Sequence, residues 1–294
     1  MTGIGGLGPP DQGELIGLGE PGRSPRSQQP SALRSTLVAL VSTVVFFGLL
    51  AWIVVNAPNW PAVQESFFNG RVFALTAEPI ARAFWVNVQL FLIAEVLILP
   101  FALVIAVLRS LPGPVFVPVR LLATVYVDVF RALPGVLVIY VLGFGIPGLA
   151  IAGVPVDPFF YAVLALTLIY SAYVSEVYRA GIESVHPSQE AAARSLGLSR
   201  FQALRHVILP QAIRRVIPPL LNDFIGLQKD TVLVSYIGVI EIFRQSYVQQ
   251  AGYFNFTPYM VTALVFVVVT LPLARLTDWL IARDKRRQAA GGAR

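Results

Sequence analysis

Long apolar runs constrain the fold of this chain more than any other feature of its sequence. Residues 37–55 are almost uninterruptedly apolar, and the runs 83–108 and 257–281 are at least as long. A helix needs about 20 apolar residues to cross a bilayer core of about 30 Å. Because lipid offers no hydrogen-bond partners to open backbone, these runs predict an all-α membrane protein.

The composition agrees with this class and excludes several others. Of the 294 residues, 56% are apolar and 13% are charged, whereas soluble domains carry nearer a quarter of charged residues. The basic excess sets orientation in such a protein, so we do not expect nucleic-acid binding. There is no cysteine, and His186 and His206 lack the companions that a metal site needs, so no metal site is expected.

The N-terminal part predicts a tail followed by a first crossing. Residues 1–32 are rich in Gly, Pro, Ser and Gln, which predicts a disordered cytoplasmic tail. Residues 33–56 contain the first apolar run, which is longer than a signal-peptide core. Because Arg23, Arg26 and Arg34 precede it, its N-terminus is expected inside.

The next two crossings are expected in residues 83–149. Residues 57–82 are expected to form an outer loop, and 83–108 the second crossing. Residues 115–149 are too long for one straight span, and Pro134 followed by Gly135 is expected to break them. A polar stripe marks the first half, which is expected along the inner interface, so that 136–149 crosses. The stripe comprises Arg120, Thr124, Asp128 and Arg131.

Three more crossings complete a predicted set of six with both termini inside. Residues 158–178 form the fourth, where Glu176 and Arg179 lie one turn apart and are expected to pair. The basic loop before residue 216 and the basic tail must both lie inside, so 216–240 is predicted to cross despite its polar residues. Residues 241–256 are then expected to form the last outer loop, before the sixth crossing at 257–281.

The longest polar interval, 183–231, has the pattern of a short displayed helix. Pro187 begins it with Ser188 as the expected N-cap, and Gly197 ends it. Three apolar side chains near this end lie on an otherwise basic surface, and such a surface suits docking into a groove of a soluble partner. They are Leu196, Leu198 and Phe201.

The same interval resembles the cytoplasmic coupling loop of ABC-importer permease subunits, closest to the polar amino acid uptake family of the histidine/glutamine/arginine type. That signature is Glu-Ala-Ala, three residues, Gly, nine residues, then Ile-x-Leu-Pro. Gly197 and residues 207–210 keep the spacing, with Val207 in place of Ile. The signature Glu falls on Ala191, while Glu190 lies one residue early and either replaces it or faces water. Residues 126–134 and 172–182 also resemble the family.

The resemblance implies a type I ABC importer transmembrane domain at 83–283, with the coupling loop at 183–210. The family core has five crossings, so 33–56 is an addition, and 284–294 is a basic cytoplasmic tail.

The resemblance also implies partners at a bacterial inner membrane. They are an ABC ATPase subunit, a second permease, identical or related, and an extracytoplasmic substrate-binding protein. Neither Lys229 nor Lys285 follows a phosphate-binding loop, so ATP is expected on the partner and no cofactor on this chain.

Two groups of residues are therefore candidates for function, and neither is catalytic. The expected contacts to the ATPase are Gln189, Glu190, Ala191, Ala192, Leu196, Gly197, Leu198, Phe201 and Pro210. The candidate translocation pathway comprises Glu95, Asp128, Asn222, Asp223, Lys229 and Asp230. A charge at the middle of a membrane costs about 2.5–3.5 kcal/mol, so these groups face the bundle interior or a partner. Residues 229–231 could equally lock the fifth helix in place.

The expected function is a permease subunit that lets a polar or charged amino acid, delivered by the external binding protein, through the membrane. In this account residues 184–201 couple the chain to its ATPase. The alternative is an ion- or proton-coupled secondary transporter that uses Glu95 and Asp230. Such a protein has no need of a docking loop, which favours the importer.

Overall fold

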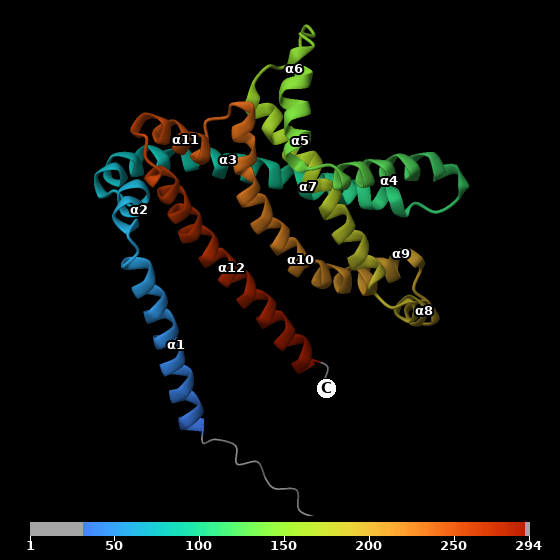
Figure 1. Cartoon of the computed structure of the whole chain (residues 1–294). Coiled ribbons are helices and arrows are strands. Elements are labelled where there is room, and N and C mark those ends of the chain that lie inside the picture. Colours follow the sequence, from blue (N-terminus) through green and yellow to red (C-terminus); the bar gives the residue numbers. More distant parts are fainter. Residues whose placement is uncertain (1–31, 292–294) are drawn as a thin grey trace, which may run out of the picture. The chain divides into compact units, whose positions relative to one another are not determined.

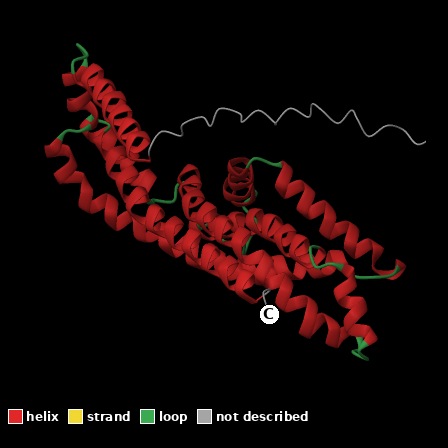
Figure 2. Ribbon diagram, turned by 90° about the horizontal axis from the view of Figure 1, so that it is seen from below, coloured by secondary structure: helices red, strands yellow, loops and turns green. Residues whose placement is uncertain are grey.

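The computed structural model describes residues 32–291, which are helical throughout apart from their connections and contain no strand (Figure 2). The chain divides into two compact units, residues 1–60 and 61–294. The first unit contains α1 (Ala32–Val55), whose large apolar side chains are exposed along its whole length. A helix that is apolar all round suits a lipid environment. The predicted tail, 1–32, lies outside the described residues except for Ala32.

After the boundary at Trp60 come α2 (Trp60–Phe67) and α3 (Gly70–Ser110), so residues 57–82 are largely helical and not the loop that the sequence predicted. Asn69 caps α3, because its Oδ1 accepts from the N–H groups of Arg71 and Val72 at 3.0 Å each. With 41 residues, α3 is about 60 Å long, twice the thickness of a bilayer core. Hydropathy does not detect the first turns of α3, because they contain the exposed charged pair of Glu78 and Arg82.

The break predicted at Pro134 is confirmed. Residues 114–132 and 135–148 form two helical arms that meet at 107°. Proline cannot donate the next helical hydrogen bond, and it restricts the residue before it to extended backbone. The arms consist of η1 (Pro114–Phe116), α4 (Val117–Ala132), α5 (Gly135–Tyr140), the π-helical turn η2 (Val141–Gly145) and α6 (Ile146–Gly148).

The remaining chain is helical from residue 158 to residue 291, with short connections. It contains α7 (Pro158–Glu183), α8 (Pro187–Ser195), α9 (Arg200–Ala203), the π-helical turn η3 (Leu204–Ile208), α10 (Leu209–Asp230), the 3₁₀ helix η4 (Thr231–Ile237), α11 (Ile242–Tyr253) and α12 (Thr257–Gly291). The predicted fourth and sixth crossings fall within α7 and α12. The predicted loop at 241–256 is wrong, because Glu241 caps α11 there.

The predicted fifth crossing, 216–240, is not one regular helix. After Asp230 the backbone tightens into η4, and Gly238 ends it at φ +93°. In the described part of the chain, four helices are long and apolar enough to cross a membrane, or five if the bent arms make one span. Because α10 is too polar to be among them, the count of six stays a prediction.

The core of the second unit forms around α7, which packs against α3, α4, α5 and α10 (Figure 1). Its close contact with α10 depends on Gly181, where an added Cβ would lie 2.0 Å from Cγ1 of Val216. The start of α8 lies against the C-terminal end of α3, because one groove is lined by Ser110, His186 and Pro187. In contrast, α11 packs on the other end of α3 through Ile80 and Ile242.

Candidate functional site

The displayed helix predicted after Pro187 is present as α8, but its N-cap is His186 and not Ser188. Nδ1 of His186 accepts from the N–H of Ser188 at 3.2 Å. Pro187 takes the first helical position, where its missing N–H costs nothing. Ser188 therefore lies inside the first turn.

The prediction that α8 ends at Gly197 is confirmed, and its C-terminus is a Schellman motif around this residue. Gly197 has φ +86°, and its N–H donates to the carbonyl of Arg194 at 3.0 Å. The N–H of Leu198 donates to the carbonyl of Ala193 at 3.3 Å. The turn places Leu196 at the tip, with 84% of its surface exposed.

The other expected contact residues surround this tip. Phe201, just after the turn, is 68% exposed. Ala193 is buried, Glu190 and Leu198 are half-buried, and the rest are exposed, namely Gln189, Ala191, Ala192, Gly197 and Pro210. We refer below to α8 together with Leu196 and Phe201, the two large exposed apolar side chains at its C-terminal end, as the α8 knob.

A cluster of ion pairs lies just before the α8 knob in the chain, at the C-terminal part of α7. The predicted pair is confirmed, with Arg179 Nη2 at 2.6 Å from Oε2 of Glu176. The sequence did not reveal that Arg109 of α3 also pairs with Oε1 of Glu176, or that Arg131 of α4 lies 3.9 Å from the same oxygen. Arg179 also pairs with Glu183 at 2.6 Å. This Glu176 cluster ties three helices together.

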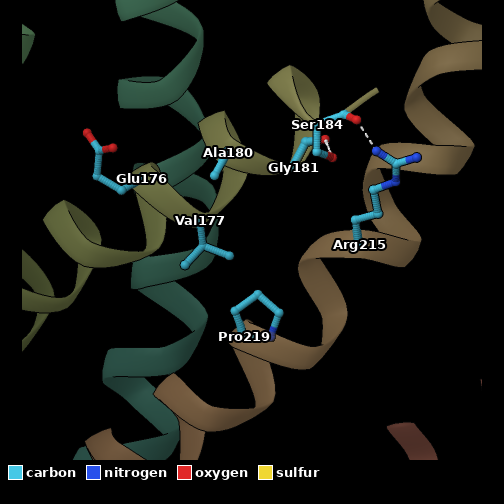
Figure 3. A pocket seen from close by; sticks show the side chains of 7 residues that line it. All are labelled: Glu176, Val177, Ala180, Gly181, Ser184, Arg215 and Pro219. Carbon is cyan, nitrogen blue, oxygen red and sulfur yellow. Dashed lines mark hydrogen bonds between the residues drawn. The ribbon is translucent and has the colours of Figure 1, made fainter. Parts of the chain in front are cut away.

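A groove of about 400 Å³ separates α7 from α10 beside this cluster (Figure 3). Its lining residues are Glu176, Val177, Ala180, Gly181, Ser184, Arg215 and Pro219. Arg215 of α10 donates a hydrogen bond from Nη1 to the carbonyl oxygen of Ser184, the residue that caps α7. The end of α7 is thus held to α10 immediately before the α8 knob begins.

The structure brings together only part of the candidate pathway. Glu95 of α3 and Asp223 of α10 are both half-buried and lie close enough to interact electrostatically. Asp223 Oδ2 is buried and has no hydrogen-bond partner among the described residues. Asp230 accepts a hydrogen bond from the Tyr170 hydroxyl at 2.7 Å. In contrast, three candidates are exposed, namely Asp128, Asn222 and Lys229.

Thr231 supports the view that the end of α10 is locked in place. It is fully buried, and its Oγ1 accepts from Asn87 Nδ2 at 3.0 Å. Asn87 also donates to Oε2 of the buried Glu241 at 3.0 Å. Burial raises the pKa of Glu241, while hydrogen bonds from the N–H groups of Phe243 and Arg244 and from Asn87 oppose this rise.

Sequence reasoning missed Asn87 and Glu241. The only signal for either was a polar residue within or beside an apolar run, which does not reveal its partner. No group of three histidine, aspartate or glutamate side chains in the described part of the chain is arranged to hold a metal ion.

Comparisons with known proteins agree on one kind of molecule. A family model described as "Binding-protein-dependent transport system inner membrane component" matches residues 98–286. The probable glutamine ABC transporter permease protein GlnM of Bacillus subtilis is 39% identical over 170 residues, which cover 58% of this chain and 77% of that protein. The inner membrane amino-acid ABC transporter permease protein YhdY of Escherichia coli is 31% identical over 281 residues, covering 89% and 74%.

Solved structures show the same fold. A chain of the crystal structure of an amino acid ABC transporter with histidines superposes with a TM-score of 0.64 and 32% identity. The match covers 69% of this chain and 93% of that one. The methionine ABC transporter MetNI in an inward-facing conformation matches with a TM-score of 0.52 at 17% identity, which supports the fold alone.

Proposed function

The chain belongs to the family of binding-protein-dependent transport system inner membrane components, and from this premise we propose that it is the permease subunit of an ATP-driven amino acid importer. Its substrate is a polar or charged amino acid delivered by an external binding protein. Relatives whose names specify amino acid transport support this choice. The chain is a multi-pass inner-membrane protein, and we place both termini in the cytoplasm because the loop at 184–215 and the C-terminal tail are basic.

The observation that carries the proposal is the α8 knob. Leucine and phenylalanine side chains that are 84% and 68% exposed on a basic loop are unfavourable in water unless a partner covers them. A capped two-turn helix with one apolar tip fits a groove on a soluble protein. The ATPase subunit is that partner, since this family of chains works with separate energy-supplying subunits.

Motion of the knob has a direct route to the transmembrane helices. Ser184 is bound to Arg215, Gly181 packs against Val216, and the Glu176 cluster joins α7 to α3 and α4. A displacement of α8 by the ATPase therefore moves α7 and α10 together. Rigid-body rocking of such helices around a central site provides alternating access.

The docking surface is tested by placing charges on the two apolar side chains. We expect the double variant Leu196→Asp/Phe201→Asp to lose co-purification with the ATPase subunit and to lose ATP-driven uptake, because burying two carboxylates opposes docking. Ser195→Asp is the matched control, since it adds a charge to the same exposed helix without removing an apolar side chain. Undiminished association of the double variant would show that the α8 knob is not the docking surface.

A further inference from the structure

The side chain of Asn87 holds both ends of one segment of the chain. Its Nδ2 donates to Thr231, the first residue of η4, and to Glu241, which caps α11, at 3.0 Å each. Its Oδ1 accepts from the N–H of Ile242 at 3.0 Å. Asn87, Thr231, Glu241 and Ile242 are each at most 2% exposed. These bonds form a buried clamp between α3 and residues 231–242.

The clamped segment has an unusual backbone. Its seven-residue 3₁₀ helix is longer than the usual three or four residues, and such runs often mark a hinge or a strained sequence. Because Thr231, Glu241 and Ile242 are all bound to one side chain of α3, neither end of the segment can leave α3 while the clamp is intact.

The segment is also closely fitted against other elements. An added Cβ at Gly143, in the π-helical turn η2, would lie 2.7 Å from Cγ2 of Ile237. The Tyr236 ring lies 6.0 Å from that of Tyr140 in α5. The 3₁₀ helix therefore packs against α5 and a second irregular helical turn.

We propose that Asn87 is a positioning residue for transport, which holds both ends of residues 231–242 against α3 and makes them move with α3 and α11. The inference rests on the proposed importer function, in which the docking loop moves α10. The clamp transmits this motion beyond Asp230 to the segment and to α11. Without it, the segment slips along α3 while α10 moves.

An exchange of groups across one hydrogen bond tests the clamp. Asn87→Asp places a second carboxyl 3.0 Å from Oε2 of Glu241, whereas Asn87→Asp/Glu241→Gln leaves one carboxylate and one amide in contact, with the direction of their hydrogen bond reversed. The double variant also loses the donor to Thr231 and the acceptor of the Phe243 N–H at Oε2. The remaining groups that face the Glu241 carboxylate are the N–H groups of Phe243 and Arg244. Each variant is assembled with its ATPase and binding protein in proteoliposomes, and uptake is measured from pH 6 to pH 8.

We expect Asn87→Asp to lower the maximal uptake rate about tenfold at pH 8, with the half-saturating concentration of loaded binding protein unchanged. The rate should recover as the pH falls, because two adjacent carboxyls share one proton and that proton restores a hydrogen bond. The double variant should transport faster than Asn87→Asp at pH 8 and should lose the pH dependence, because only one carboxyl then remains in the clamp. Rates are taken relative to the wild-type complex at the same pH.

Hydrogen exchange of the purified permease is a second measurement that does not depend on transport. Amides of residues 232–240 should exchange slowly in the wild type, much faster in Asn87→Asp at pH 8, and at an intermediate rate in the double variant. A wild-type complex that takes up no amino acid contradicts the proposed function, while hydrogen exchange still tests the clamp. The inference is overturned if Asn87→Asp takes up amino acid and exchanges its amides like the wild type. It is also overturned if the double variant is no faster than Asn87→Asp at pH 8, or if uptake falls only in proportion to the thermal stability of the complex.

Discussion

At the scale of single residues, a few side chains hold the parts of this chain together. Glu176 joins three helices through arginines that are distant in sequence, and Gly181 lets α7 approach α10 closely. In the importer that we propose, these two residues make α7 move together with the docking loop.

We expect Glu176→Gln to destabilise the folded permease by on the order of 3 kcal/mol, because it leaves Arg109, only 13% exposed at its side chain, without its carboxylate. Arg131→Gln is the control, since that pair is 3.9 Å apart and Arg131 is 45% exposed. It should cost less than about 1 kcal/mol. Thermal unfolding in detergent measures both, and equal effects would contradict a central role of Glu176.

We expect Gly181→Ala to destabilise the permease by about 1–3 kcal/mol, because the new Cβ overlaps the side chain of Val216. The double variant Gly181→Ala/Val216→Ala removes the overlapping methyl groups and should recover part of the loss. A double-mutant cycle of unfolding temperatures measures this coupling. Purely additive effects would show that the two helices do not meet there.

At the scale of elements, short-range signals predicted more than long-range ones. The break at Pro134, the end of α8 at Gly197 and the pair of Glu176 with Arg179 were predictable, because each depends on residues a few positions apart. The helices at 60–82 and 242–253 were missed, since hydropathy does not detect polar helices capped by Asn69 and Glu241. The contacts of Arg109, Arg131 and Asn87 join distant parts of the chain, which no spacing rule reveals.

The turn after α8 provides a test at this scale. Gly197→Ala should cost about 1–2 kcal/mol at that turn, because a side chain is strained at φ +86°. The turn then opens, and we expect weaker association with the ATPase while the transmembrane helices keep their fold. Gly148→Ala is the control, since open space surrounds that glycine. Co-purification at increasing salt concentration compares the two, and equal retention would contradict the importance of the turn.

At the scale of the whole molecule, the second unit contains the region that matches the family, residues 98–286, and the α8 knob. The first unit contains α1, and the sequence predicts that this helix is an addition to a five-crossing core. In the function that we propose, the energy for transport arrives through the docking loop.

We expect the second unit to assemble without the first. A permease that lacks residues 1–56 should co-purify with its ATPase and retain ATP-driven uptake, because the packed core of α3, α7 and α10 lies wholly in the remaining chain. Size-exclusion chromatography and uptake in proteoliposomes measure the result. Loss of the assembled complex would show that the first helix belongs to the functional core.

Reconstitution tests the source of energy most directly. The chain is placed in vesicles either alone or with its ATPase and binding protein, and radiolabelled amino acids are followed with ATP or with an imposed proton gradient. We expect accumulation only in the full complex and only when ATP is hydrolysed. Accumulation by this chain alone, driven by the proton gradient without any nucleotide hydrolase, would contradict the account and favour a secondary transporter that uses Glu95 and Asp230.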